Sequence, residues 1–133
     1  MMVVVDTHAL VWQLNADQKM GKTARRRLER ALTRDELCVS AVTFWEIALL
    51  VNRDRLRLDT TATHFRWRVL EMGIRELSVD GEVALQAAVL APVLMDPIDC
   101  FVTATALTHG ATLMTADIRL LESRAVDVLD ARR

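Results

Sequence analysis

The chain has 133 residues, of which 52% are hydrophobic and 26% are charged, and its formal net charge is -1. This size and composition favour one compact domain over 1–133 and exclude a disordered chain, and the balanced charge excludes a uniformly basic nucleic-acid-binding domain. Two cysteines and short apolar runs exclude a disulfide scaffold and a membrane-spanning protein, so we expect a cytoplasmic protein that uses no membrane.

The first predicted element is a buried strand over 3–5, the valine run of "VVVDTHALVW". A short β-branched run of this kind is typical of a central parallel strand. Asp6 follows the strand at once, and we expect a short helix carrying Ala9, Leu10 and Trp12 after it. Taken alone, Asp6 fits a carboxylate that accepts backbone N–H bonds in a turn as well as it fits a metal ligand.

The next stretch alternates helices with one strand. Residues 23–32 form a predicted amphipathic helix with a wide arginine-rich face, and 37–40 form the second predicted strand. Apolar residues at helical spacing predict a helix over 43–52, and its opening "TFWE" has the pattern of a capping box that ends on Glu46. The cap signal at 59–61 predicts a further helix that stops at the next glycine.

The second half of the chain repeats this alternation. Asp80 caps a predicted helix that we expect to end at Pro92. Asp96 is followed by proline and predicts another helix start, because Asp is a favoured N-cap and Pro is favoured at the first helical position. The remaining predicted strands are 74–79, 112–115 and, as a candidate fifth, 125–129.

Strands that alternate with helices predict an α/β fold with three layers, in which helices cover both faces of a central parallel sheet of four or five short strands. In such sheets, ligands bind outside the carboxyl ends of the strands, near the point where the strand order reverses. Four acidic residues are predicted to lie at that edge: Asp6, Glu46, Asp99 and Asp117.

Carboxylates that converge in this way repel one another, and a divalent cation removes the repulsion. Mg²⁺ and Mn²⁺ prefer oxygen ligands, and such an ion can lower the pKa of a bound water and stabilise charge on a phosphodiester. The predicted edge therefore favours a site for Mg²⁺ or Mn²⁺.

Each of these carboxylates also has an ordinary structural explanation. Glu46 in the first turn of its helix fits the capping box. Asp99 near a helix N-terminus complements the helix dipole, and Asp117 fits the cap of a following turn. Each explanation is adequate alone, but together they require four independent coincidences at one edge of the sheet.

Three further residues lie next to these acids in the sequence. Thr7 and Thr115 either cap turns or hydrogen-bond a carboxylate or a metal-bound water. His8 stands one residue into a predicted helix, and we expect it to be a neighbour that takes no part in the chemistry.

At these motifs the sequence resembles PIN-domain proteins, and among them the VapC-type ribonuclease toxins of bacterial toxin-antitoxin modules. The resemblance runs from "VVVDTHALVW" through "SAVTFWEIALL" and "DPIDCFVTATAL" to "LMTAD", in the family's order and spacing. It implies a PIN-like fold and metal-dependent hydrolysis of RNA phosphodiesters by an endonuclease. It further implies a homodimer and inhibition by a VapB-like antitoxin.

Carried over residue by residue, the resemblance implies that Asp6, Glu46, Asp99 and Asp117 form the acidic quartet that binds Mg²⁺ or Mn²⁺. Thr115 is then a polar neighbour, and Thr7 follows the first Asp as in many relatives. Asp96 matches the first acid of the family's "DP-x-D" element, and we interpret it as a helix cap.

Two positions depart from the family pattern, which often has His before "DP" and Arg after the second Asp. Here these positions are Met95 and Cys100. The missing arginine removes a contact to phosphate or to a carboxylate, so an alternative is a non-catalytic PIN-like module that binds RNA or a protein partner.

Phosphotransfer folds with aspartates at strand ends are a further alternative. A haloacid-dehalogenase-like phosphatase would need a second Asp two residues after Asp6, where His8 stands. That class and the response-regulator receivers both use a lysine late in the chain, and no lysine follows Lys22. The sequence therefore favours the nuclease.

Overall fold

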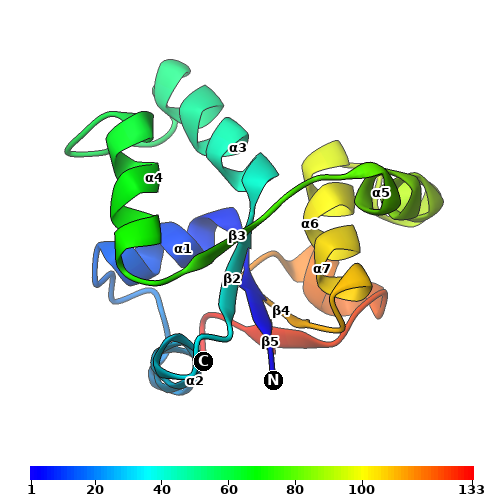
Figure 1. Ribbon diagram of the computed structural model, residues 1–133, viewed down its shortest axis with the longest axis horizontal. Helices are drawn as coiled ribbons and strands as arrows, with labels where there is room; N and C mark the ends of the chain where they lie inside the picture. Colours follow the sequence, from blue (N-terminus) through cyan, green and yellow to red (C-terminus); the bar gives the residue numbers. More distant parts are fainter.

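Five parallel strands form one central sheet in the computed structural model, which describes residues 1–133. The strands are β1 (Val3–Val5), β2 (Leu37–Ser40), β3 (Arg75–Leu77), β4 (Thr112–Thr115) and β5 (Val128–Asp130). Their order is β3-β2-β1-β4-β5, and every neighbouring pair is parallel (Figure 1). From β1 at the centre, the chain adds β2 and β3 on one side of the sheet and then β4 and β5 on the other. The strand order therefore reverses between β1 and β4.

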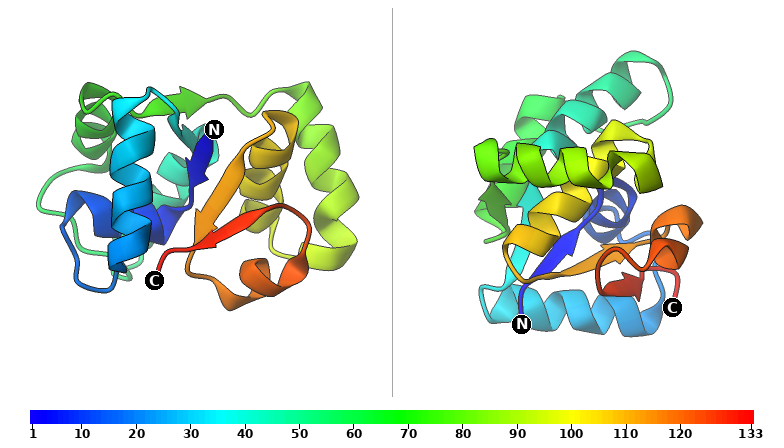
Figure 2. Two further views of the ribbon diagram at one scale, coloured as in Figure 1. Left: turned by 90° about the horizontal axis from the view of Figure 1, so that it is seen from below. Right: turned by 90° about the vertical axis from the view of Figure 1, so that its right-hand side faces the viewer.

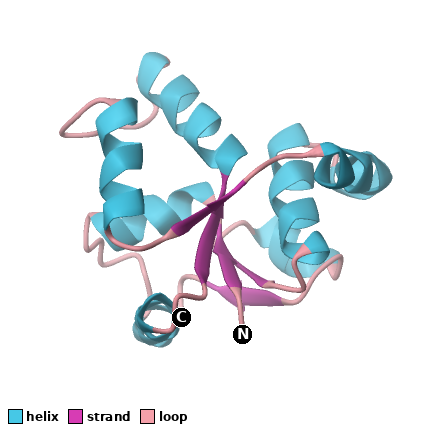
Figure 3. Ribbon diagram, in the orientation of Figure 1, coloured by secondary structure: helices cyan, strands magenta, loops and turns pink.

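Helices cover both faces of this sheet, as Figures 2 and 3 show. They are α1 (Thr7–Leu14), α2 (Lys22–Thr33), α3 (Ala41–Asn52), α4 (Ala62–Glu71), α5 (Gly81–Leu94), α6 (Pro97–Thr108) and α7 (Ile118–Ser123). Helices α1, α2 and α4 pack on one face, α5, α6 and α7 pack on the other, and α3 contacts helices of both layers. The predicted three-layer α/β/α fold is confirmed.

The valine run explains why β1 lies at the centre of the sheet. Val3 and Val5 are buried in the core beneath α1, α2 and α4, whereas Val4 is buried in the core beneath α5 and α6. Side chains alternate between the faces of a strand, so a strand covered on both faces must be apolar at every position. The predicted central strand is therefore confirmed.

Side-chain caps start most of the helices, and one of them explains why α3 begins earlier than the sequence predicts. Ser40 caps α3 by accepting the N–H of Val42, so the helix begins at Ala41 rather than at 43. Thr43 is consequently a fully buried residue inside the first turn. The predicted capping box does not form, and Glu46 lies in the second turn, where its side chain is available for another partner.

The boundaries of three other elements also differ from those predicted. Pro92 lies inside α5, which continues to Leu94 because Leu90 and Leu94 are both buried against α6 and outweigh the hydrogen bond that proline removes. The third strand, predicted over 74–79, is limited to three residues that pair with β2. The fifth strand begins three residues later than predicted, at Val128, where pairing with Leu113 of β4 starts.

No helix of the fold combines the length and the apolar character that a membrane crossing requires.

Candidate active site

A pocket of about 440 Å³ opens at the carboxyl ends of β1 and β4, at the reversal of strand order. All four predicted acids line it, although they come from widely separated parts of the chain. With Asp96, the acidic lining residues are Asp6, Glu46, Asp96, Asp99 and Asp117. The expectation that these side chains share one edge of the sheet is therefore met by the structure.

Asp6 serves the fold and the pocket with different oxygens. Its Oδ1 accepts the N–H of Ala9 at 3.0 Å and caps α1, and its Oδ2 accepts the hydroxyl of Thr115. Burial raises the pKa of the Asp6 carboxyl, while the hydrogen bond from Thr115 opposes that effect. The turn-making explanation for Asp6 is correct without excluding the other one, because the carboxylate also faces the pocket.

Glu46 reaches across from α3 to the start of α1, where the buried Thr7 hydroxyl donates a hydrogen bond to Glu46 Oε1. The side chain thus bridges two helices that follow different strands. Because it lies in the second turn of α3, it makes no cap bond, and its carboxylate borders the pocket instead.

Asp99 is held at its place by the residue that caps α6. Asp96 Oδ1 accepts the N–H groups of Ile98 at 2.9 Å and of Asp99 at 3.2 Å, which confirms the predicted cap. Only 18% of the Asp99 side chain is exposed. Burial, followed by the negative charges of Asp96 and Asp117, raises the pKa of Asp99 from 3.8 to about 7.

Asp117 completes the acidic wall from the start of α7. Its Oδ1 accepts the N–H of Arg119 at 2.9 Å and caps the helix, and its own N–H donates to Thr115 Oγ1 at 3.0 Å. Thr115 therefore accepts from Asp117 and donates to Asp6, so one hydroxyl links two of the four acids.

Two arginines that the sequence analysis did not select also line the pocket. Arg119 Nη2 lies 3.4 Å from Asp117 Oδ2 and 3.9 Å from Asp99 Oδ2. Arg132 is paired with Asp130, with a distance of 2.8 Å between its Nη2 and Asp130 Oδ2. The sequence offers a signal for Arg119, which follows the predicted ligand Asp117 by two residues. It offers none for Arg132, which lines the pocket because of the path that the chain takes after β5.

A family model described as the PIN domain matches residues 3–125 of this sequence. The chain belongs to the PIN-domain family. This PIN domain is 31% identical over 123 residues to Ribonuclease VapC22 from Mycobacterium tuberculosis, and the match covers 92% of each chain.

Solved structures share the fold of this PIN domain at lower identity. The structure of VapBC-1 from nontypeable Haemophilus influenzae matches with a TM-score of 0.72 at 17% identity and covers 100% of both chains. The structure of VapBC2 from Rickettsia felis, bound to a DNA fragment from their promoter, matches with a TM-score of 0.72 at 13% identity and covers 98% of both chains. At these identities the likeness establishes the fold.

The donor set of the pocket suits a hard divalent cation, since all the acidic lining groups offer carboxylate oxygens. No three acidic, histidine or cysteine side chains are arranged closely enough to hold an ion as they stand. The Arg119 guanidinium instead offsets part of the negative charge of Asp99 and Asp117, and the hydroxyls of Thr7 and Thr115 donate hydrogen bonds to Glu46 and Asp6. A divalent cation would offset the mutual repulsion of these carboxylates, so the chemistry of the residues present fits a hard divalent cation.

The remaining predicted neighbours have different places in this PIN domain. His8 is exposed and lines the pocket. Met95 is 81% exposed just before the α6 cap and does not line the pocket. Cys100 is buried in the core between α5 and α6 and does not line the pocket. The family arginine missing at Cys100 has a counterpart at the pocket, because Arg119 places a guanidinium beside Asp99.

Proposed function

We propose that this PIN domain is a metal-dependent RNA endonuclease, a VapC-like toxin that is inhibited by a cognate VapB-like antitoxin. One observation carries the proposal: Asp6, Glu46, Asp99 and Asp117 share one pocket at the carboxyl edge of the sheet. The chain is also 31% identical, over nearly its full length, to a protein named as a ribonuclease.

In this proposal the four acids are both the metal ligands and the catalytic residues, and the ion is Mg²⁺ or Mn²⁺. When bound, such an ion supplies a water of lowered pKa and stabilises negative charge on the phosphodiester. Thr7 and Thr115 position Glu46 and Asp6 through their hydroxyl hydrogen bonds. Asp96 acts through the backbone, because its cap fixes the first turn of α6 and therefore the direction in which Asp99 points.

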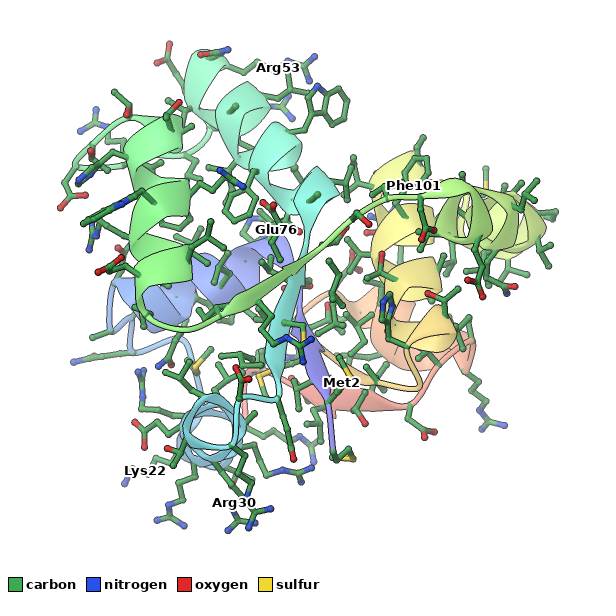
Figure 4. The ribbon with its side chains drawn as sticks, in the orientation of Figure 1. Met2, Lys22, Arg30, Arg53, Glu76 and Phe101 are labelled. Carbon is green, nitrogen blue, oxygen red and sulfur yellow. The ribbon has the colours of Figure 1, made fainter.

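The arginines nearest to the pocket are the best candidates to contact RNA phosphate. Arg119 and Arg132 lie in its lining, and guanidinium groups pair well with phosphate oxygens. The arginine-rich face of α2 lies elsewhere, since Arg30 borders a depression shared with Met1 and Val3 at the amino end of β1. Figure 4 shows Arg30 and Lys22 on α2. An RNA bound in the pocket would contact the arginine-rich face of α2 only if it extended around the molecule.

The solved structures of VapBC-1 and VapBC2, which share this fold, support the proposed antitoxin. An acidic pocket is electrostatically complementary to a basic segment of a partner protein. We therefore expect a VapB-like chain to place basic side chains at the mouth of the pocket and to compete there with the metal and with RNA.

Helix α5 supports a homodimer. It exposes Leu85, Val89 and Val93, which are spaced four residues apart on one side of the helix and are 74%, 69% and 65% exposed. Contiguous exposed apolar patches are uncommon on monomeric proteins and mark sites of association. We propose that two copies pack these faces together, as a two-fold dimer would.

Cleavage of a labelled RNA tests the nuclease directly. The wild-type protein should cut RNA with Mg²⁺ or Mn²⁺ and should stop when EDTA is added. Asp6→Asn and Glu46→Gln should each abolish cleavage, while Arg30→Gln on α2 should retain it as the charge-changing control. Cleavage that survives EDTA or both acid variants would refute the metal-carboxylate mechanism. Binding of RNA without any cleavage by the wild type would favour the non-catalytic binding module.

A further inference from the structure

The guanidinium of Arg119 lies between two carboxylates that belong to different helices. Its Nη2 is 3.4 Å from Asp117 Oδ2 on the α7 side and 3.9 Å from Asp99 Oδ2 on the α6 side. The contact with Asp117 is local in sequence, but the contact with Asp99 joins two separate walls of the pocket. Arg119 therefore brings positive charge to the same pair of oxygens that the proposed metal ion would use.

Arg119 is also free to leave this position. Its side chain is 73% exposed, and its only side-chain hydrogen bond is the long one to Asp117 Oδ2. Exposed ion pairs contribute little to stability, so moving the side chain into solvent costs little. Arg132 differs, because two hydrogen bonds of 3.0 Å and 2.8 Å hold it on Asp130.

We propose that Arg119 is a displaceable counterion, which neutralises Asp99 and Asp117 when no metal is bound and is driven outward when a divalent cation takes that place. This inference rests on the proposed function. Once displaced, the guanidinium stands at the mouth of the pocket with no carboxylate partner, and it can bind a phosphate of the RNA.

The physical argument is a competition for the same oxygens. A divalent cation such as Mg²⁺ would bind the carboxylate oxygens of Asp99 and Asp117 directly, and these are the oxygens that the Arg119 guanidinium contacts. The like charges of the ion and of Arg119 add repulsion. Metal binding to the free protein is therefore weakened by Arg119, and RNA that draws Arg119 away should strengthen it. Linkage requires the converse, so bound metal should strengthen RNA binding by the same factor.

The test measures Mn²⁺ affinity without RNA, by the electron paramagnetic resonance signal of free Mn²⁺ and by calorimetry. Arg119→Gln should bind Mn²⁺ roughly three- to tenfold more tightly than the wild type, since it loses an exposed competing charge. Arg119→Lys should keep most of the weakening. Arg30→Gln removes the same charge far from the pocket and should leave Mn²⁺ affinity unchanged.

A second measurement separates the proposed phosphate contact of Arg119 from a general effect of its charge on metal binding. At saturating Mn²⁺, Arg119→Gln should raise the KM for RNA with a smaller change in kcat, because the phosphate contact is lost while the metal ligands remain. Equal Mn²⁺ affinities of the wild type and Arg119→Gln would overturn the counterion inference and leave the nuclease proposal standing. Failure of every protein to bind Mn²⁺ would instead remove the proposed metal site, and the inference with it.

Discussion

Replacing Asp99 by Asn should stabilise the metal-free protein above neutral pH. Asp99 is mostly buried among other acids, and its pKa in the folded protein is raised from 3.8 to about 7. The folded state therefore binds a proton that the unfolded state releases between these values, so the free energy of unfolding falls as the pH rises from about 4 to 7. Above this window the full cost of the buried charge is present.

The size of the effect follows from the same values. At about 1.4 kcal/mol per pKa unit, the difference between 3.8 and about 7 corresponds to roughly 4 kcal/mol. Because 18% of the side chain is exposed, solvent screens part of this cost, and we expect about 2 to 4 kcal/mol. Asp99→Asn should gain this amount at pH 8 and almost nothing at pH 4.

Urea unfolding in EDTA at several pH values measures this difference. Asp127→Asn is the matched control, since Asp127 is exposed and outside the pocket, and it should change the free energy of unfolding little at either pH. Addition of Mn²⁺ should reverse the order, because the wild type gains binding energy that Asp99→Asn lacks. A destabilised Asp99→Asn at pH 8 in EDTA would refute the claim that the buried charge of Asp99, next to Asp96 and Asp117, destabilises the metal-free protein.

Three further predictions address other parts of the fold. Thr115→Val removes the hydroxyl that is hydrogen-bonded to both Asp6 and Asp117, so Mn²⁺ affinity in calorimetry and the rate of RNA cleavage should each fall roughly tenfold. Unchanged values would contradict a positioning role for Thr115. Val89→Asp on α5 should convert a dimer to a monomer in light scattering, and a persisting dimer would place the interface elsewhere. Leu113→Ala in β4 should cost about 2 to 5 kcal/mol of unfolding free energy in urea, and a loss below 1 kcal/mol would argue against a tightly packed core there.

The sequence predicted the acid positions well where strand ends determine them. Asp6 and Asp117 follow β1 and β4 closely, so locating two short apolar strands was enough to place both residues at one edge. Asp99 followed in the same way from the Asp96 cap, since a cap with proline after it defines the first turn of a helix.

Glu46 was placed at the correct edge for a partly wrong reason. Ser40 and Thr43 are both acceptable helix caps, and local sequence does not choose between them. The choice is made by packing, because Thr43 is fully buried and the chain turns directly from β2 into α3. The predicted helix end at Pro92 was wrong for a related reason. Burial of Leu90 and Leu94 outweighs the tendency of proline to end a helix. Arg119 went unnoticed because its importance lies in its distance to Asp99 of another helix.

The double use of the aspartates has a consequence for loss-of-function variants. Asp6 and Asp117 each give one oxygen to a helix start, and the other oxygen meets the pocket. An amide at either position can keep the oxygen that caps the helix while it loses the charge, whereas alanine loses both. Asparagine variants should therefore lack nuclease activity but still fold and still bind the antitoxin. In a cell that carries both forms, such a variant would draw the inhibitor away from the active toxin and so increase its effect.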